Sequence, residues 1–141
     1  MSRNVHHQYL RAVPLFADCD NHDLDVIGSA VTELAFNEGE VIMRAGSTAR
    51  EMVIVLEGEL SVLLGETEIA TIGAGGFAGE MGLLTHSRRN ATVAAKTKTR
   101  VLHLESRSFG NVLDEAPQIA VKMLPIVASR VVENNARSHL E

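Results

Sequence analysis

The sequence is poor in several residue types that mark whole classes of protein. It has one cysteine, Cys19, no tryptophan, one tyrosine and four phenylalanines among 141 residues. A single cysteine excludes an internal disulfide, and the core must be built mainly from Val, Ile, Leu and Met. No apolar run approaches the roughly 18 residues of a membrane-spanning helix, and the polar first eleven residues lack the apolar segment of a signal peptide. These absences favour a cytoplasmic protein with no membrane segment in this chain.

The chain also lacks a basic excess and a recognisable catalytic set. Its 13 basic and 18 acidic residues give a formal net charge of −5, whereas nonspecific nucleic-acid binding needs a basic surface. We interpret the one acid-free basic window, Arg88 to Arg100, as a solvated strand face. The six histidines show no metal-ligand spacing within the strand region. No catalytic triad, in which a third residue orients the base that activates a nucleophile, is visible either. We therefore expect no metal site, no enzymatic activity and no direct DNA binding.

The remaining composition and its periodicity predict one mainly β domain. At 141 residues and 45% hydrophobic, the chain suits a single domain with a real core. Apolar residues recur at helical spacing over 5–34, alternate or cluster in short strand-like segments over 35–105, and return to helical spacing over 106–137. We expect a β-roll of about eight strands, a double-sheet arrangement of jelly-roll type, with N-terminal helices and a C-terminal lid helix.

Six segments of the middle region have strand patterns and are separated mostly by glycine or short polar turns. They are Val41–Met43, Met52–Leu56, Leu60–Leu64, Glu68–Ile72, Thr92–Ala95 and Val101–Leu104. Pro117 suits the first turn of the final helix.

The stretch from Gly73 to Ala95 carries the chemistry. Gly79 to Leu84 looks like one helical turn inserted between two strands, and the glycine-rich approach would let backbone N–H groups face an anion. Arg89 can direct two N–H donors onto phosphate oxygens, while the Glu80 carboxylate can accept a hydrogen bond from a ribose 2′-hydroxyl. A ligand with both groups is a cyclic nucleotide.

Each of these residues also has a plainer interpretation. Glu80 could be an ordinary acid in a first helical turn, and Arg89 a solvated arginine. His86 lies in the loop before Arg89 and could approach the phosphate, but an exposed loop histidine is the plainer interpretation. A loose dinucleotide fingerprint over Gly73 to Ala78 is rejected, because the segment that follows is basic and strand-like instead of completing a β-α-β unit.

Residues 77–95 resemble the phosphate-binding cassette of cyclic-nucleotide-binding domains, as found in catabolite-activator-type regulators, protein kinase A regulatory subunits and nucleotide-gated channels. The family's cassette has Gly-Glu opening a short helix, a Leu-Leu-type pair closing it, and then Arg-x-Ala-Thr/Ser-Val. The matching residues here are Gly79-Glu80, Leu83-Leu84 and Arg89-Asn90-Ala91-Thr92-Val93. Further similar segments follow the family's order along nearly the whole chain: Val13 to Phe16, Glu38 to Gly46, and Met52 to Leu60.

The resemblance implies that Arg89 binds the cyclic phosphate and Glu80 the ribose hydroxyl. Backbone N–H groups would complete the cradle, so that the implied site comprises Phe77, Gly79, Glu80, Met81, Arg89, Asn90 and Ala91. Two residues depart from the family's pattern: Asn90 replaces the usual Ala, Ser or Thr, and Ala78 a common aromatic or glycine. The ligand is expected to be cAMP, with cGMP as the alternative, and Asn90 leaves this choice open because its position is linked to base selectivity in the family.

The last helix has a wider apolar arc than packing on one side requires. The arc comprises Ile119, Met123, Leu124, Val127, Ala128, Val131 and Val132. We expect ligand, a second copy of the chain or an effector domain to cover the excess, and the helix to move on ligand binding. Arg130 lies beside the arc, where it could cover the base by a cation–π contact or lie along the helix edge. The remaining alternative is a scaffold domain of the same fold that binds no ligand.

Overall fold

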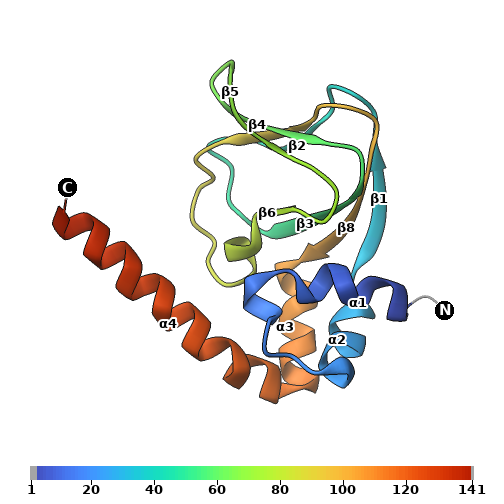
Figure 1. The fold of residues 1–141 in the computed structure, drawn as a ribbon, viewed down its shortest axis with the longest axis vertical. Coiled ribbons are helices and arrows are strands. Elements are labelled where there is room, and N and C mark those ends of the chain that lie inside the picture. Colours follow the sequence, from blue (N-terminus) through green and yellow to red (C-terminus); the bar gives the residue numbers. More distant parts are fainter. Residues whose placement is uncertain (1–2, 141) are drawn as a thin grey trace.

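Two four-stranded antiparallel sheets form a roll, with helices gathered at one end of it (Figure 1). This computed structural model describes residues 3–140. The strand orders are β1-β8-β3-β6 in the first sheet and β2-β7-β4-β5 in the second. The strands are β1 Thr32–Phe36, β2 Val41–Met43, β3 Glu51–Glu57, β4 Leu60–Leu64, β5 Thr67–Ile72, β6 Phe77–Ala78, β7 Thr92–Ala95 and β8 Thr99–Glu105. The predicted β-roll is confirmed.

Helices precede, interrupt and follow the strands. The chain begins with α1 Arg3–Arg11, the 3-10 turn η1 Pro14–Phe16 and α2 Asn21–Gly28. A second 3-10 turn, η2 Glu80–Leu83, lies between β6 and β7, where the sequence predicts one inserted helical turn. The chain ends with α3 Ser106–Glu115 and α4 Pro117–Leu140. Figure 1 shows α4 running outward from the body of the domain, past the side on which η2 lies.

The central strands of the first sheet are buried on both faces. Val53, Val55 and Val101 point into the roll, where they pack with Met43, Leu60 and Val93 of the second sheet. Alternate residues of the same strands pack against the helices in a second cluster that includes Met52, Ile54, Leu102, Leu104, Phe16, Phe109 and Ile119. A strand covered on both faces needs no polar alternation, which explains the continuous apolar run in β3.

The roll begins earlier than the sequence pattern indicates. The boundary between helical and strand regions is expected at 34/35, but α2 ends at Gly28 and β1 already begins at Thr32. β1 is an edge strand, mostly exposed, whose register with β8 runs from Thr32 opposite His103 to Phe36 opposite Thr99. β1 therefore forms by pairing with β8, a strand far away in the sequence: Glu33 and Arg100, which are in contact, are 67 residues apart. Because β1 is mostly exposed, its own sequence shows little alternation of apolar and polar residues.

The N-terminal part of α4 is fixed to α2. The helix begins at Pro117, as predicted, and buries Ile119 and Met123 in the helical core. Asp23 of α2, only 1% exposed, accepts a hydrogen bond from Gln118 Nε2 at 3.1 Å and forms an ion pair with Lys122. Within residues 3–140, no helix combines the length and the hydropathy that crossing a bilayer requires.

Candidate functional site

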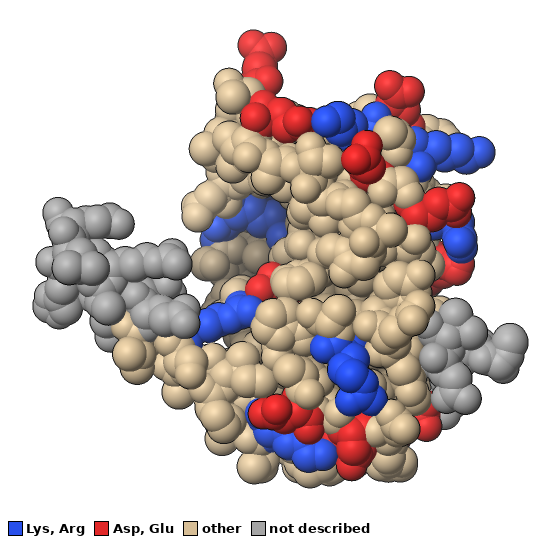
Figure 2. All heavy atoms as spheres, in the orientation of Figure 1, with Lys and Arg blue, Asp and Glu red and all other residues tan. Residues whose placement is uncertain are grey.

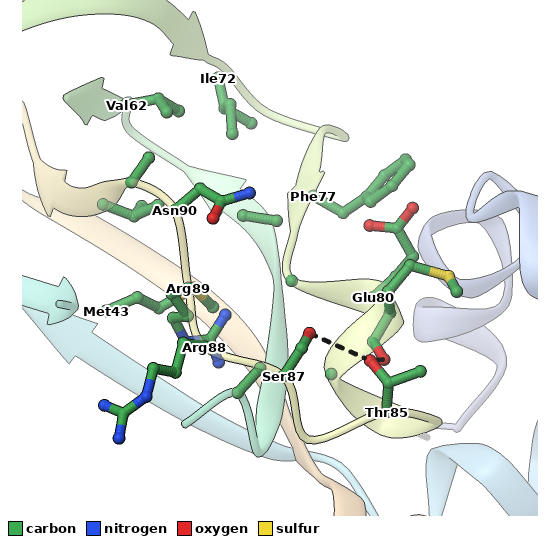
Figure 3. A pocket seen from close by; sticks show the side chains of 17 residues that line it. Met43, Val62, Ile72, Phe77, Glu80, Thr85, Ser87, Arg88, Arg89 and Asn90 are labelled. Carbon is green, nitrogen blue, oxygen red and sulfur yellow. Dashed lines mark hydrogen bonds between the residues drawn. The ribbon is translucent and has the colours of Figure 1, made fainter. Parts of the chain in front are cut away.

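A cavity of about 380 Å³ opens on the roll beside η2. Figure 2 shows it as a hollow between the roll and the outgoing helix, with basic side chains on its wall. In the close view, Phe77 and Glu80 lie on one side of the cavity and Arg89 and Asn90 on the other (Figure 3). All seven residues that the sequence predicts from the cassette line this one cavity: Phe77, Gly79, Glu80, Met81, Arg89, Asn90 and Ala91.

Gly79 makes the turn from β6 into η2 possible. Its φ is +81°, a left-handed conformation that residues with a side chain rarely adopt. A Cβ at this position would also lie 2.7 Å from the carbonyl oxygen of Glu51 and 3.0 Å from an Arg89 guanidinium nitrogen. The glycine therefore brings the cassette backbone against β3 and leaves room for the arginine.

Arg89 is half-buried and held on three sides. Its N–H donates to the carbonyl of Ser47 at 2.8 Å, and its own carbonyl accepts from the N–H of Gly46 at 2.8 Å. In the side chain, Nη2 donates to the carbonyl of Glu51 at 3.0 Å. Burial lowers the pKa of the guanidinium, an effect that the nearby Glu51 carboxylate opposes. A fixed, partly desolvated cation of this kind gains from an anionic ligand.

Four backbone N–H groups of the cavity wall have no hydrogen-bond partner among the loop and turn contacts of the described residues. They belong to Gly79, Met81, Asn90 and Ala91, which lie outside the paired strands. Backbone donors in such a wall can be satisfied by a ligand oxygen or by water. Arg89 and these groups form a donor-rich surface suited to a phosphate.

Glu80 is engaged by α4. Its Oε2 lies 2.9 Å from Nη1 of Arg130, and both side chains are mostly buried, at 18% and 25% exposure. Arg130 itself is not among the residues that line the cavity. The Arg130 side chain of α4 thus forms an ion pair with Glu80 of η2. The predicted contact of Arg130 with a nucleotide base stays a prediction.

Several residues of the cavity wall have no signal in the cassette motif. Val62 of β4, Ile72 of β5 and Met43 of β2 contribute apolar side chains to the wall (Figure 3). Only the alternation of their strands could indicate them, because each lies on the inward face of the second sheet. Thr85 and Ser87 add hydroxyls whose oxygens lie 3.5 Å apart. His86 points elsewhere, with Nε2 3.3 Å from Ser106 Oγ of α3.

Comparison with known families decides what kind of cavity this is. The family described as cyclic nucleotide-binding domain matches residues 33–116, more than half of the chain. The chain belongs to this family. The match covers every residue that lines the cavity of this cyclic nucleotide-binding domain, from Met43 to Val93, and the predicted family is confirmed.

Relatives of the domain occur in channels, kinases and transcriptional regulators. The chain is 34% identical over 107 residues to the potassium/sodium hyperpolarization-activated cyclic nucleotide-gated channel 3 of Homo sapiens, covering 76% of this chain and 14% of that protein. It is 26% identical over 115 residues to the cAMP-dependent protein kinase regulatory subunit of Schizosaccharomyces pombe, covering 81% and 28%. It therefore spans less than a third of the length of these curated relatives.

A solved structure supports the same assignment. The N-terminal domain of a transcriptional regulator from Streptomyces coelicolor A3(2) matches with a TM-score of 0.82 and 26% identity, covering 91% of this chain and 95% of that one. The similarity therefore includes the flanking helices as well as the roll.

Within the described residues, no three His, Cys, Asp or Glu side chains gather as a metal site would require. The described side chains of the cavity comprise one carboxylate, Glu80, and two arginines, Arg88 and Arg89. The cavity is therefore suited to recognising an anion that also carries a hydroxyl group.

Proposed function

We propose that the domain binds a cyclic nucleotide, preferentially cAMP, and that binding moves α4. Arg89 binds the cyclic phosphate, Glu80 accepts the ribose 2′-hydroxyl, and the N–H groups of Gly79, Met81, Asn90 and Ala91 complete the cradle. The observation that carries this proposal is the convergence on one cavity of a half-buried guanidinium, that of Arg89, and a carboxylate, that of Glu80.

The shape of the cavity suits the rest of a nucleotide. Its apolar wall of Val62, Ile72 and Phe77 can pack against a base, while the donor-rich surface holds the phosphate. A volume of about 380 Å³ lies in the range of small-molecule sites. Nothing in this scheme requires a bond to be made or broken, so the proposed role is recognition and not catalysis.

Glu80 supplies the connection to α4. Its carboxylate pairs with Arg130 at 2.9 Å, and a ribose hydroxyl would share or replace that partner. The beginning of α4 stays attached to α2 through the ion pair between Asp23 and Lys122. Loss of the Arg130–Glu80 ion pair would therefore move only the part of the helix beyond Pro125. A ligand can shift α4 only to the extent that its affinity differs between the two positions of the helix.

Base choice depends on the wall beside Asn90. Its amide can both donate and accept, and therefore can contact the edge of adenine or of guanine. The similarity to a kinase subunit named as cAMP-dependent supports cAMP, and cGMP is the alternative.

The signal would pass to an effector domain or a second copy of the chain through α4. Exposed apolar residues Val121, Leu124 and Val132 support such a contact. The domain would then act as a cytoplasmic regulatory module.

Calorimetric titration of the purified chain with cAMP, cGMP and 5′-AMP tests the proposal. One-site saturation by cAMP is expected, with weaker binding of cGMP and at least tenfold weaker binding of 5′-AMP, whose open phosphate no longer fits between the cradle and Glu80. Absence of binding by both cyclic nucleotides would favour the alternative of a ligand-independent scaffold.

A further inference from the structure

His103 and Glu51 form an ion pair directly behind the cassette. His103 lies on β8 and Glu51 on the neighbouring strand β3, with 2.5 Å between Nε2 and Oε2. Both side chains are largely shielded, at 17% and 30% exposure. The backbone register places Glu51 opposite Glu105 and His103 opposite Val53. The imidazole therefore lies close to two acidic residues.

Glu51 also contacts the phosphate-binding residues through its backbone. Its carbonyl accepts the hydrogen bond from Arg89 Nη2 at 3.0 Å, and Gly79 and Gly82 both pack against that carbonyl. Its carboxylate acts on the same guanidinium, because it opposes the fall in the pKa of Arg89 that burial causes. One residue thus joins His103 to the cation that would receive the phosphate.

The charged groups around His103 are few in the described chain. Glu51 approaches from β3 and Glu105 from β8 itself, and both favour the protonated imidazole. Its partner on β1 is the uncharged Thr32. The helix α1, which packs against β3, carries His7, but that imidazole is engaged by Asp25 at 2.7 Å. The positive charge of Arg89 in the cassette contributes to lowering the pKa of Glu51.

We propose that His103 is a positioning residue, whose protonation sets through Glu51 how strongly Arg89 binds a nucleotide phosphate. The proposal rests on the proposed function and adds a regulation of that site. With His103 protonated, the Glu51 carboxylate is neutralised by its partner and the full charge of Arg89 is available to the ligand. With His103 neutral, the negative charge of Glu51 near Arg89 is uncompensated and weakens the attraction of the site for a phosphate.

The direction of the pH effect follows from this arrangement. The hydrogen bond that His103 donates to the Glu51 carboxylate raises the pKa of His103, and the same bond lowers the pKa of Glu51. Both groups are therefore charged between these two values. As pH rises through the raised pKa of His103, the site loses one positive charge and its affinity for an anion falls. By linkage, phosphate binding raises the pKa of His103 further.

Affinity for cAMP, measured by calorimetry from pH 5.5 to 9, tests the proposal. The unmodified chain is expected to lose about threefold to tenfold in affinity across the titration of His103, the effect of one nearby charge in a partly shielded site. His103→Gln keeps a donor for Glu51 but does not titrate, so its affinity should not vary with pH in this range. Glu51→Gln should move the midpoint to lower pH and bind cAMP more tightly than the unmodified chain at pH 8.5.

His86→Gln is the matched control, since this histidine lies in the cassette loop but contacts Ser106; it should retain the pH dependence. NMR titration of the His103 imidazole with and without cAMP needs no variant and should show its pKa rising on binding. The proposal is overturned if His103→Gln keeps the pH dependence or if the imidazole titrates identically in both states. Binding of neither cAMP nor cGMP at any pH would instead overturn the proposed function, and this inference with it.

Discussion

At the residue scale, the close approach of the cassette to β3 depends on Gly79. Its positive φ and the 2.7 Å that would separate a Cβ from the Glu51 carbonyl are two independent obstacles to any side chain. We expect Gly79→Ala to lower the free energy of unfolding by about 1–3 kcal/mol and to weaken cAMP binding. Gly39→Ala is the control, because Gly39 has φ +89° but nothing within 4 Å of an added Cβ. Equal unfolding midpoints in urea for the two variants would contradict the steric account.

Glu80 should determine how the domain recognises ribose. The unmodified chain should prefer cAMP over 2′-deoxy-cAMP by at least tenfold, because the analogue lacks the hydroxyl that donates to the mostly buried Glu80 carboxylate. Glu80→Gln should reduce this preference, whereas Arg130→Gln should keep it, since the carboxylate remains. Competition binding with both nucleotides measures the ratio. A wild-type ratio close to one would remove the ribose role of Glu80.

The cassette motif indicated the residues of the donor-rich surface, because consecutive positions of one loop stay together in space. It could not indicate Val62 or Ile72, whose place in the wall depends on the register of β4 and β5. The pairing of Glu80 with Arg130 was likewise beyond the motif, because it depends on the direction in which α4 leaves the roll.

At the scale of elements, α4 is anchored at one end and engaged by the cassette further along. The anchor centres on Asp23. Burial raises the pKa of this carboxyl, but hydrogen bonds from Lys122, the Asp20 N–H and Gln118 outweigh burial and lower the pKa below its usual value. The stability that Asp23 contributes is therefore present above its unfolded pKa of about 3.9 and is lost as pH falls through the folded value.

Asp23→Asn should lower the free energy of unfolding at pH 7 by about 1–3 kcal/mol, because it breaks the ion pair and leaves buried donors facing one another. The difference from the unmodified chain should stay constant from about pH 5 to 8 and shrink below about pH 4. Urea unfolding across this range measures it. Asp18→Asn, at an exposed position beside the network, should change little; a pH-independent difference for Asp23→Asn would contradict the anchor.

The second half of α4 is expected to respond to ligand. Amide exchange over residues 126–135 should slow on saturation with cAMP, by more than exchange in β1 (Thr32–Phe36), none of whose residues lines the cavity, because local opening of the helix governs its protection. Truncation after Leu124 should weaken cAMP binding and leave the roll folded. Unchanged exchange together with undiminished binding by the truncated chain would make α4 a static brace.

At the scale of the whole molecule, the order of short strands, glycine turns and cassette was enough to predict the roll. The strands with their own apolar pattern, such as β4 and β7, lie where the pattern puts them. The sequence pattern does not indicate β1 or the two-residue strand β6. Both are edge strands of the first sheet, where β1 pairs with β8 and β6 pairs with β3. Pairing of that kind is a property of the tertiary fold and leaves little trace in a local sequence.

The central claim is that Arg89 receives the phosphate of a cyclic nucleotide, and the cAMP affinity of Arg89→Ala tests it most directly. Loss of a charge-assisted contact in a partly buried site should cost about 2–5 kcal/mol of binding, or roughly thirtyfold or more in Kd. Arg107→Ala, which removes an exposed guanidinium of α3 that does not line the cavity, should remain within about threefold of the unmodified chain. Arg89→Ala protein that is folded and binds cAMP within that same threefold range would contradict the account.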